Sequence, residues 1–247
     1  MRRIALAAAF AAVSLSACSD DGSQALPHTS IATPPAAVSN ETTAGAGPSA
    51  GRTAAKGQGF DFYVLALSWS PSYCESEGRD ANRQQCASGR AYSFIVHGLW
   101  PQHERGYPAD CETNERDVPR HIASSLYDIM PSAGLIRQQW RKHGSCAGLS
   151  QSDYFDVVRA ARTRVQIPSE FRSLTERRPV EPKALEQAFV AANPGLQSDG
   201  FAISCDGQLM EEVRICMTKS LQFRACPEVE KRECRARKLV MPAMRGR

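Results

Sequence analysis

The sequence predicts an α+β fold with a mainly antiparallel central sheet and several helices packed on it. Segments with strand character lie near both ends of the part that can fold, and segments with helical spacing are grouped between them. This order does not give the regular strand and helix alternation of a parallel sheet. The cysteines in the same part of the chain add the expectation of disulfide bonds.

Residues 1–17 have the pattern of an export signal. Arg2 and Arg3 precede an apolar run over residues 4–13, which is too short to span a bilayer as a stable helix. Small residues before Cys18 resemble a lipoprotein cleavage site, which predicts a lipid on its thiol. An ordinary signal peptide with an incidental cysteine is the alternative. We therefore expect a protein of the cell envelope, periplasmic or extracellular, whose only membrane contact is this lipid.

Residues 18–59 are dominated by Ala, Gly, Ser, Thr and Pro and contain almost no large apolar side chains. Such a segment cannot bury enough surface to offset its ordering entropy, so we expect a flexible tether. Residues 60–247 are long enough for one good-sized domain.

The strands follow from runs of aromatic and β-branched residues. Phe62–Trp69 is predicted as a buried strand, and a second strand over Tyr92–His97 would place His97 at its end. Phe201–Cys205 and Glu211–Thr218 flank a turn at Asp206-Gly207, which predicts a hairpin.

Four segments have helical spacing: Pro119–Met130, Leu135–His143, Ser152–Arg164 and Pro182–Ala192. We expect Gly144 to end the second of them. Because residues three and four apart share a helix face, Gln139, Lys142 and His143 should project together.

Two histidines stand in unusual sequence blocks. His97 lies in FIVHGLWPQ and His143 in QWRKHGSC. A glycine follows each histidine, and its missing side chain is expected to let a substrate backbone come close. Imidazoles titrate near neutral pH, so one can take a proton while the other gives one. RNA carries its own nucleophile in the 2'-hydroxyl, and Lys142 could neutralise charge that develops on the phosphoryl oxygens. The net charge of +4 is compatible with a polyanionic substrate.

These blocks resemble the paired active-site segments of the ribonuclease T2 family, secreted or periplasmic endoribonucleases with the patterns HGLWP and H-E-W-x-K-H-G-[ST]-C. HGLWP is intact from His97, and W-x-K-H-G-S-C from Trp140. The resemblance implies a catalytic domain over residues 60–247, with His143 as general base, His97 as general acid and Lys142 stabilising the transition state. It further implies 2',3'-cyclic phosphate and 5'-hydroxyl products, an RNA substrate, a monomer, and neither metal nor cofactor.

The sequence departs from the family pattern at several positions. Gln139 and Gln138 replace the usual Glu and His, and an amide cannot exchange a proton or carry charge. We expect a working enzyme with an altered pH profile; a catalytically weakened RNA binder is the alternative. The resemblance places Trp100 in a base pocket, and Tyr107 is a second stacking candidate. Gln102 stands where relatives often have Asp, which leaves the preferred base open.

Eight cysteines remain after Cys18 is removed from the nine, and the resemblance implies four pairs: Cys74–Cys86, Cys111–Cys146, Cys205–Cys234 and Cys216–Cys226. A metal-dependent hydrolase or envelope scaffold is the rival from another class, although no C-x-x-C pair or histidine-rich ligand spacing supports it. His103 and His121 are assigned to the surface, and Trp69 and Trp140 to the core.

Overall fold

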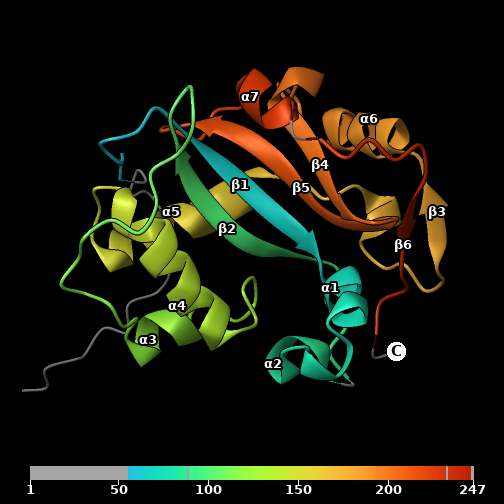
Figure 1. Ribbon diagram of the computed structural model, residues 1–247, viewed down its shortest axis with the longest axis horizontal. Coiled ribbons are helices and arrows are strands. Elements are labelled where there is room, and N and C mark those ends of the chain that lie inside the picture. The colour runs from blue at the N-terminus through green and yellow to red at the C-terminus, as the bar shows by residue number, and fades with distance from the viewer. Residues whose placement is uncertain (1–54, 88, 232, 246–247) are drawn as a thin grey trace, which may run out of the picture. The chain divides into compact units, whose positions relative to one another are not determined.

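The computed structural model describes residues 55–87, 89–231 and 233–245 (Figure 1). The expected export signal, Cys18 and most of the expected tether lie outside these residues. Within the described part, the amide of Gln58 donates to the carbonyl of Ala147 at 2.9 Å, so the chain is tied to the domain just before Phe60. No helix among the described residues is long and apolar enough to cross a membrane.

The described strands form one sheet of six (Figure 1). The neighbours run in the order β2-β1-β5-β6-β3, and β4 pairs with β5. All pairs are antiparallel except β5 with β6, which confirms the predicted sheet class. The strands are β1 (Phe62–Trp69), β2 (Phe94–Gln102), β3 (Arg178–Val180), β4 (Phe201–Asp206), β5 (Leu209–Thr218) and β6 (Leu239–Met241).

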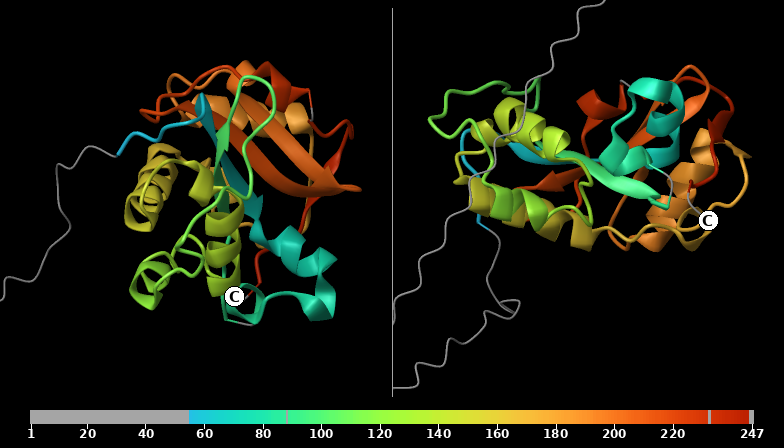
Figure 2. Two further views of the ribbon diagram at one scale, coloured as in Figure 1. Left: turned by 60° about the vertical axis from the view of Figure 1, so that its left-hand side comes forward. Right: turned by 90° about the horizontal axis from the view of Figure 1, so that it is seen from below.

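Helices lie around this sheet and line its margins (Figure 2). The α-helices are α1 (Ser70–Ser76), α2 (Arg83–Cys86), α3 (Arg120–Ser124), α4 (Ala133–Lys142), α5 (Gln151–Arg164), α6 (Pro182–Ala192) and α7 (Pro227–Glu230). Together with the sheet they give the expected α+β class.

Two helix predictions need correction. The helix expected over Pro119–Met130 ends at Ser124, because the hydroxyls of Ser124 and Ser125 bond to nearby carbonyls and compete with the helical ladder. The next long helix, α5, is capped by Ser150, whose hydroxyl accepts from the amide of Asp153 at 3.2 Å. Ser152, the expected cap, lies inside that helix.

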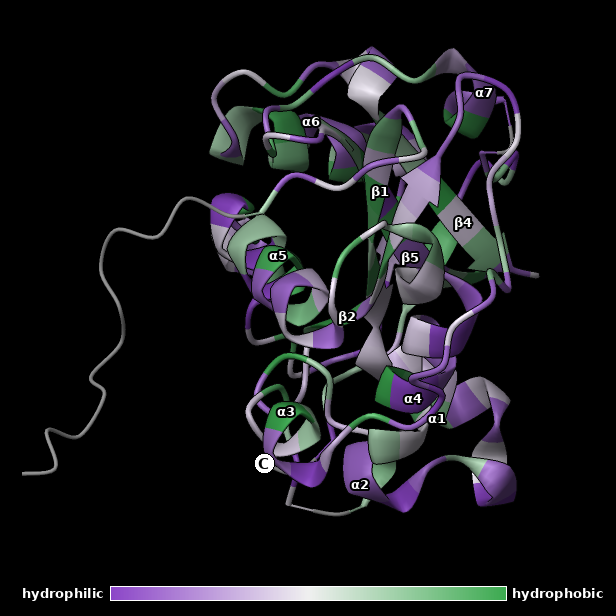
Figure 3. Cartoon of the chain, turned by 90° about the vertical axis from the view of Figure 1, so that its left-hand side faces the viewer, coloured by the Kyte–Doolittle hydropathy of each residue, from purple (hydrophilic) through white to green (hydrophobic). Residues whose placement is uncertain are grey.

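Strand β1 is buried on both faces. Tyr63, Leu65, Leu67 and Trp69 belong to the main core, which also holds Tyr154 and Phe155 of α5 and Phe189 of α6. Phe62 and Val64 point the other way, into a second cluster with the Cys216–Cys226 disulfide. The central strand is therefore an almost unbroken apolar run, as the sequence predicted. Figure 3 shows hydrophobic residues on the strands, and both hydrophobic and hydrophilic residues along α4 and α5.

Four disulfides close the domain, and they are the pairs that the resemblance implied. Cys111–Cys146 joins the loop after β2 to the turn that follows α4. Asp110 reinforces this link, because its amide donates to the carbonyl of Lys142 at 2.9 Å. The end of α4 is thus fixed by a covalent bond and a hydrogen bond.

Replacing Cys111 and Cys146 together by alanine should lower the free energy of unfolding by about 2 to 4 kcal/mol, because the open chain gains entropy. Urea unfolding measures the change. The matched pair Cys74→Ala with Cys86→Ala should cost less, since its sequence separation is 12 residues against 35. An equal or larger loss at the shorter loop would contradict this account.

Candidate active site

A β-bulge positions His97. Ala66 of β1 pairs with Gly98 of β2, and Leu67 pairs with Val96, so His97 lies between them without a partner on β1. The extra residue reverses the side-chain alternation along β2. His97 and Trp100 therefore point to the same face, and their ring centroids are 5.4 Å apart.

The expected position of His97 at a strand end is wrong. Strand β2 runs on to Gln102, so His97 lies in its interior. The strand continues through Pro101, a residue that seldom occurs inside a sheet. Here β2 is at the edge of the sheet, where a proline can be accommodated.

Both glycines of the two blocks make room for the protein itself. A Cβ on Gly98 would lie 2.1 Å from Oε1 of Gln139 and 2.3 Å from Nε1 of Trp100. A Cβ on Gly144 would lie 2.6 Å from the Trp140 ring. The expectation that they admit a substrate backbone is therefore corrected: both positions are filled by neighbouring side chains.

Helix α4 supplies the second half of the site. It ends at Lys142, and His143 forms its C-cap, with its amide donating to the carbonyl of Gln139 at 3.0 Å. Gln139 and His143 are buried and Lys142 is exposed, yet all three line one cavity, as their helical spacing predicted.

This cavity has a volume of about 350 Å³ and brings together residues from distant parts of the chain. His97 and Trp100 come from β2, and Lys142 and His143 from the end of α4. His97 also lines a second cavity, of about 690 Å³. The two cavities therefore have His97 in common.

The two histidines have different electrostatic surroundings. His143 is 6% exposed, and its Nδ1 is buried without a hydrogen-bond partner. Burial, followed by the positive charges of Lys142 and His97, lowers the pKa of His143 to about 4. His143 is consequently neutral over the whole physiological pH range.

His97 instead contacts a buried carboxylate. Its Nδ1 is 2.8 Å from Oε2 of Glu212. The other carboxylate oxygen of Glu212 accepts from Nε of Arg214 at 2.7 Å. Burial opposes the charge of this carboxylate, but the hydrogen bond from His97 and the positive charges of His97 and Arg214 hold the pKa of Glu212 below its usual range.

The two aromatic candidates, Trp100 and Tyr107, differ in how exposed their rings are. Trp100 donates from Nε1 to Oε1 of Gln139 at 2.8 Å, and its ring lies 5.3 Å from that of His143 and 5.6 Å from the guanidinium carbon of Arg214. Tyr107 is 47% exposed and also lines the cavity. Gln102 lines it as well, with its amide bonded to the carbonyl of Pro101.

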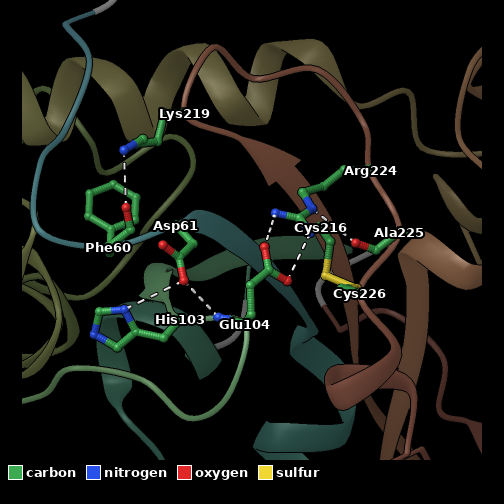
Figure 4. A network of polar contacts seen from close by, with 9 residues as sticks. All are labelled: Phe60, Asp61, His103, Glu104, Cys216, Lys219, Arg224, Ala225 and Cys226. Carbon is green, nitrogen blue, oxygen red and sulfur yellow. Dashed lines mark hydrogen bonds and ion pairs between the residues drawn. A yellow bond between two sulfur atoms is a disulfide. The ribbon is translucent and has the colours of Figure 1, made fainter.

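The loop that carries Tyr107 is anchored by a polar network (Figure 4). Arg224 forms two hydrogen bonds to Glu104, at 2.9 and 3.1 Å, and lies over the ring of Phe62. Asp61 accepts from the amide of Glu104 at 2.8 Å and lies 3.7 Å from Nδ1 of His103. These contacts hold the loop against the edge of the sheet next to the cavity.

Sequence reasoning missed part of this site. His103 is exposed, as expected, but it also lines the cavity. Glu212 and Arg214 were not singled out, although a charged pair two residues apart in a predicted strand marks one face of it. Trp69 and Trp140 are buried in the core, as predicted. Within the described residues, no three His, Cys, Asp or Glu side chains are grouped so that they could hold a metal ion.

Comparison with known proteins gives a consistent result. The model of the ribonuclease T2 family matches residues 60–226. A ribonuclease of Aeromonas hydrophila is 35% identical over 187 residues, which cover 72% of this chain and 83% of that protein. Ribonuclease I of Escherichia coli K12 is 30% identical over 138 residues, covering 40% and 52%.

Solved structures share the fold. Trichomaglin, described as an S-like ribonuclease, has a TM-score of 0.61 at 20% identity, covering 75% of this chain and 99% of that one. RNase NT in complex with 5'-AMP has a TM-score of 0.56 at 23% identity, covering 76% and 100%.

Gly98→Ala should disrupt the contact between Trp100 and Gln139, because the new methyl group would overlap both side chains. We expect a loss of about 1 to 3 kcal/mol in unfolding free energy. In a ¹H–¹⁵N NMR spectrum the indole signal of Trp100 should move, while those of Trp69 and Trp140 stay in place.

Gly134→Ala is the matched control, since its methyl group would meet only Oγ of Ser132 at 3.6 Å. It should leave all three indole signals unchanged. An unmoved Trp100 signal in Gly98→Ala would show that the close packing is not required.

Proposed function

Because the chain belongs to the ribonuclease T2 family and is therefore an RNA-cleaving endoribonuclease, we propose that it cuts single-stranded RNA by transphosphorylation, without a metal and with low base specificity. The observation that carries the proposal is the single cavity of about 350 Å³ lined by His97, His143 and Lys142. A phosphodiester in this cavity could contact both imidazoles and a cation.

The proposed reaction uses the two histidines in opposite senses. His143 removes the proton from the ribose 2'-hydroxyl, and the 2'-oxygen forms a bond to the adjacent phosphorus. The bond from phosphorus to the 5'-oxygen breaks, and His97 donates a proton to that oxygen. The products are a 2',3'-cyclic phosphate and a free 5'-hydroxyl. The low pKa of His143 supports its role as the base, because it keeps the ring unprotonated.

Lys142 and Gln139 take supporting roles in this proposal. Lys142 is exposed and lines the cavity, where its charge would stabilise the negative charge that develops on the phosphoryl oxygens. Gln139 orients Trp100 through its Oε1. An amide oxygen serves for this contact as a carboxylate oxygen would, so the change from Glu leaves the geometry of the site intact.

Tyr107 is our candidate for stacking on a base. Its ring is the more accessible of the two, whereas Trp100 is packed between His143 and Arg214. Base stacking on an aromatic side chain contributes roughly 1 to 3 kcal/mol per base. Trp100 and Gln102 would form the walls of the same base pocket, since both side chains line this cavity.

The second candidate is a catalytically weakened RNA binder with the same fold. Gln139 favours it, because no carboxylate stands at this position.

We also propose that the protein acts as a monomer. We place it in the cell envelope or outside it, because the four disulfides would persist in an oxidising compartment. Lipid attachment at Cys18 remains a part of this proposal that intact-mass measurement of the exported protein would test.

The purified protein should cleave RNA in excess EDTA and leave cyclic-phosphate ends. His97→Ala or His143→Ala should lower the rate by about 10²- to 10⁴-fold, the typical contribution of an acid or base group. Gel assays with end-group analysis measure both effects.

His121→Ala is the control, because His121 is exposed on α3 and outside both cavities. Bound but intact RNA would favour the weakened binder. Activity that EDTA abolishes would favour the metal-dependent alternative.

The pH profile of kcat/KM should remain high below neutrality and fall only as the pH drops through about 4, because His143 must be unprotonated to act as the base. Gln139→Glu adds a negative charge beside this group, which favours the imidazolium and raises the pKa of His143. The acid limb should then move to higher pH.

Gln222→Glu adds the same charge in an exposed turn after β5 and should leave the acid limb in place. An acid limb that lies near pH 6.5 in the unmodified protein, or that does not move in Gln139→Glu, would contradict this assignment.

A further inference from the structure

Glu212 is 2% exposed and lies on the face of β5 that carries the site. Strand β1 separates β5 from β2, so Glu212 and His97 must reach across it to meet. The β1 residues on this face at that level are Ala66 and Ser68, and both are small. Larger side chains there would block the contact of 2.8 Å between Glu212 and His97.

The two oxygens of Glu212 have separate partners. Oε1 is bonded to Arg214, which is two residues away on the same face of β5. Oε2 contacts Nδ1 of His97. Because a buried carboxylate is costly without compensation, this pairing keeps Glu212 charged and dedicates one oxygen to the histidine.

This contact determines how His97 can act. A carboxylate only accepts hydrogen bonds, so Nδ1 of His97 must carry the proton. Nε2 is then the nitrogen available to a substrate. When His97 is doubly protonated, the negative charge of Glu212 lies next to the imidazolium and stabilises it.

His143 has no such partner. Its Nδ1 is buried without a hydrogen bond, and the side chain of the preceding turn in α4 is the neutral Gln139. Within residues 55–87, 89–231 and 233–245, the one carboxylate in hydrogen-bond contact with either histidine therefore belongs to His97. This asymmetry favours His97 as the proton donor and His143 as the proton acceptor.

We propose that Glu212, held by Arg214, is a positioning residue that fixes His97 in its Nδ1–H tautomer and stabilises its protonated form. The proposal rests on the proposed function for its catalytic consequence. Its structural part concerns His97 alone and can be tested in the absence of RNA.

Other titratable groups line the two cavities that His97 borders. Lys142, His143 and Arg214 line the smaller cavity, and Glu77, Asp206 and Glu211 line the larger one. In the described part of the chain, Glu212 is the polar side chain that contacts the His97 ring directly, at 2.8 Å. A variant at Glu212 should therefore affect His97 more than loss of a carboxylate elsewhere.

The first test is ¹⁵N NMR of the imidazole rings in the unmodified protein. Neutral His97 should show the pattern of a protonated Nδ1 and an unprotonated Nε2. Glu212→Ala should give a mixture of tautomers. An Nε2–H pattern in the unmodified protein would overturn the proposal without the need for any variant to fold.

The second test follows protonation in Glu212→Gln, which keeps the shape and the acceptor oxygen but removes the charge. The basic limb of kcat/KM should move to lower pH, because the negative charge next to the imidazolium is lost. The value of kcat should fall by about tenfold or more with little change in KM.

Glu186→Gln is the matched control. Glu186 is also a buried glutamate, 8% exposed, paired with Lys183 on α6 outside both cavities. It should change neither the tautomer pattern of His97 nor the basic limb of kcat/KM. Thermal unfolding of both variants separates a loss of stability from a loss of positioning.

The outcomes distinguish the two proposals. An unmodified protein that does not cleave RNA would refute the proposed function, while the tautomer of His97 would still decide the role of Glu212. A Glu212→Gln variant whose basic limb and kcat both match those of the unmodified protein would refute the positioning role and leave the proposed function standing.

Discussion

The site depends on one irregularity in the sheet. If β2 paired regularly with β1, residues 97 and 100 would point to opposite faces, because successive strand residues alternate. The unpaired His97 between the Gly98 and Val96 pairs shifts this alternation by one residue. His97, Trp100 and Gln102 then share one wall of the cavity, while Phe94, Val96 and Leu99 still enter the main core. The bulge thus lets one strand serve both the core and the site.

The two histidines of the site differ in the charged groups that lie beside them. Glu212 and Arg214 support His97, whereas His143 is enclosed beside Gln139 and the indole of Trp100. Desolvation favours the neutral form of an imidazole, and an adjacent carboxylate favours the charged form. The two imidazoles therefore have different electrostatic surroundings, although their residue type is the same. Gln139 fits this arrangement, because a carboxylate at that position would reduce the contrast.

The remaining parts of the site are held by links between distant segments. Cys111–Cys146 and the Asp110–Lys142 hydrogen bond fix the end of α4. The Glu104–Arg224 ion pair secures the loop that leads to Tyr107. Loops that line a site are the least constrained elements of a fold unless such contacts restrict them. These anchors place the exposed ring of Tyr107 with its centroid 6.4 Å from that of His143.

Local sequence determined several of the elements and the candidate chemistry. The apolar run of β1, the bounds of α6 and the shared helix face of Gln139, Lys142 and His143 all follow from periodicity, which depends only on neighbours in the chain. The fold class also followed from the order of the predicted segments, and the two histidine blocks supplied the hypothesis about the chemistry. Tertiary structure alone decided the bulge at His97, the packing role of Gly98 and Gly144, and the contact of Glu212 with His97 across β1. Glu212 lies 115 residues from His97 in the sequence. Such a contact depends on the order and register of three strands, which no local pattern specifies.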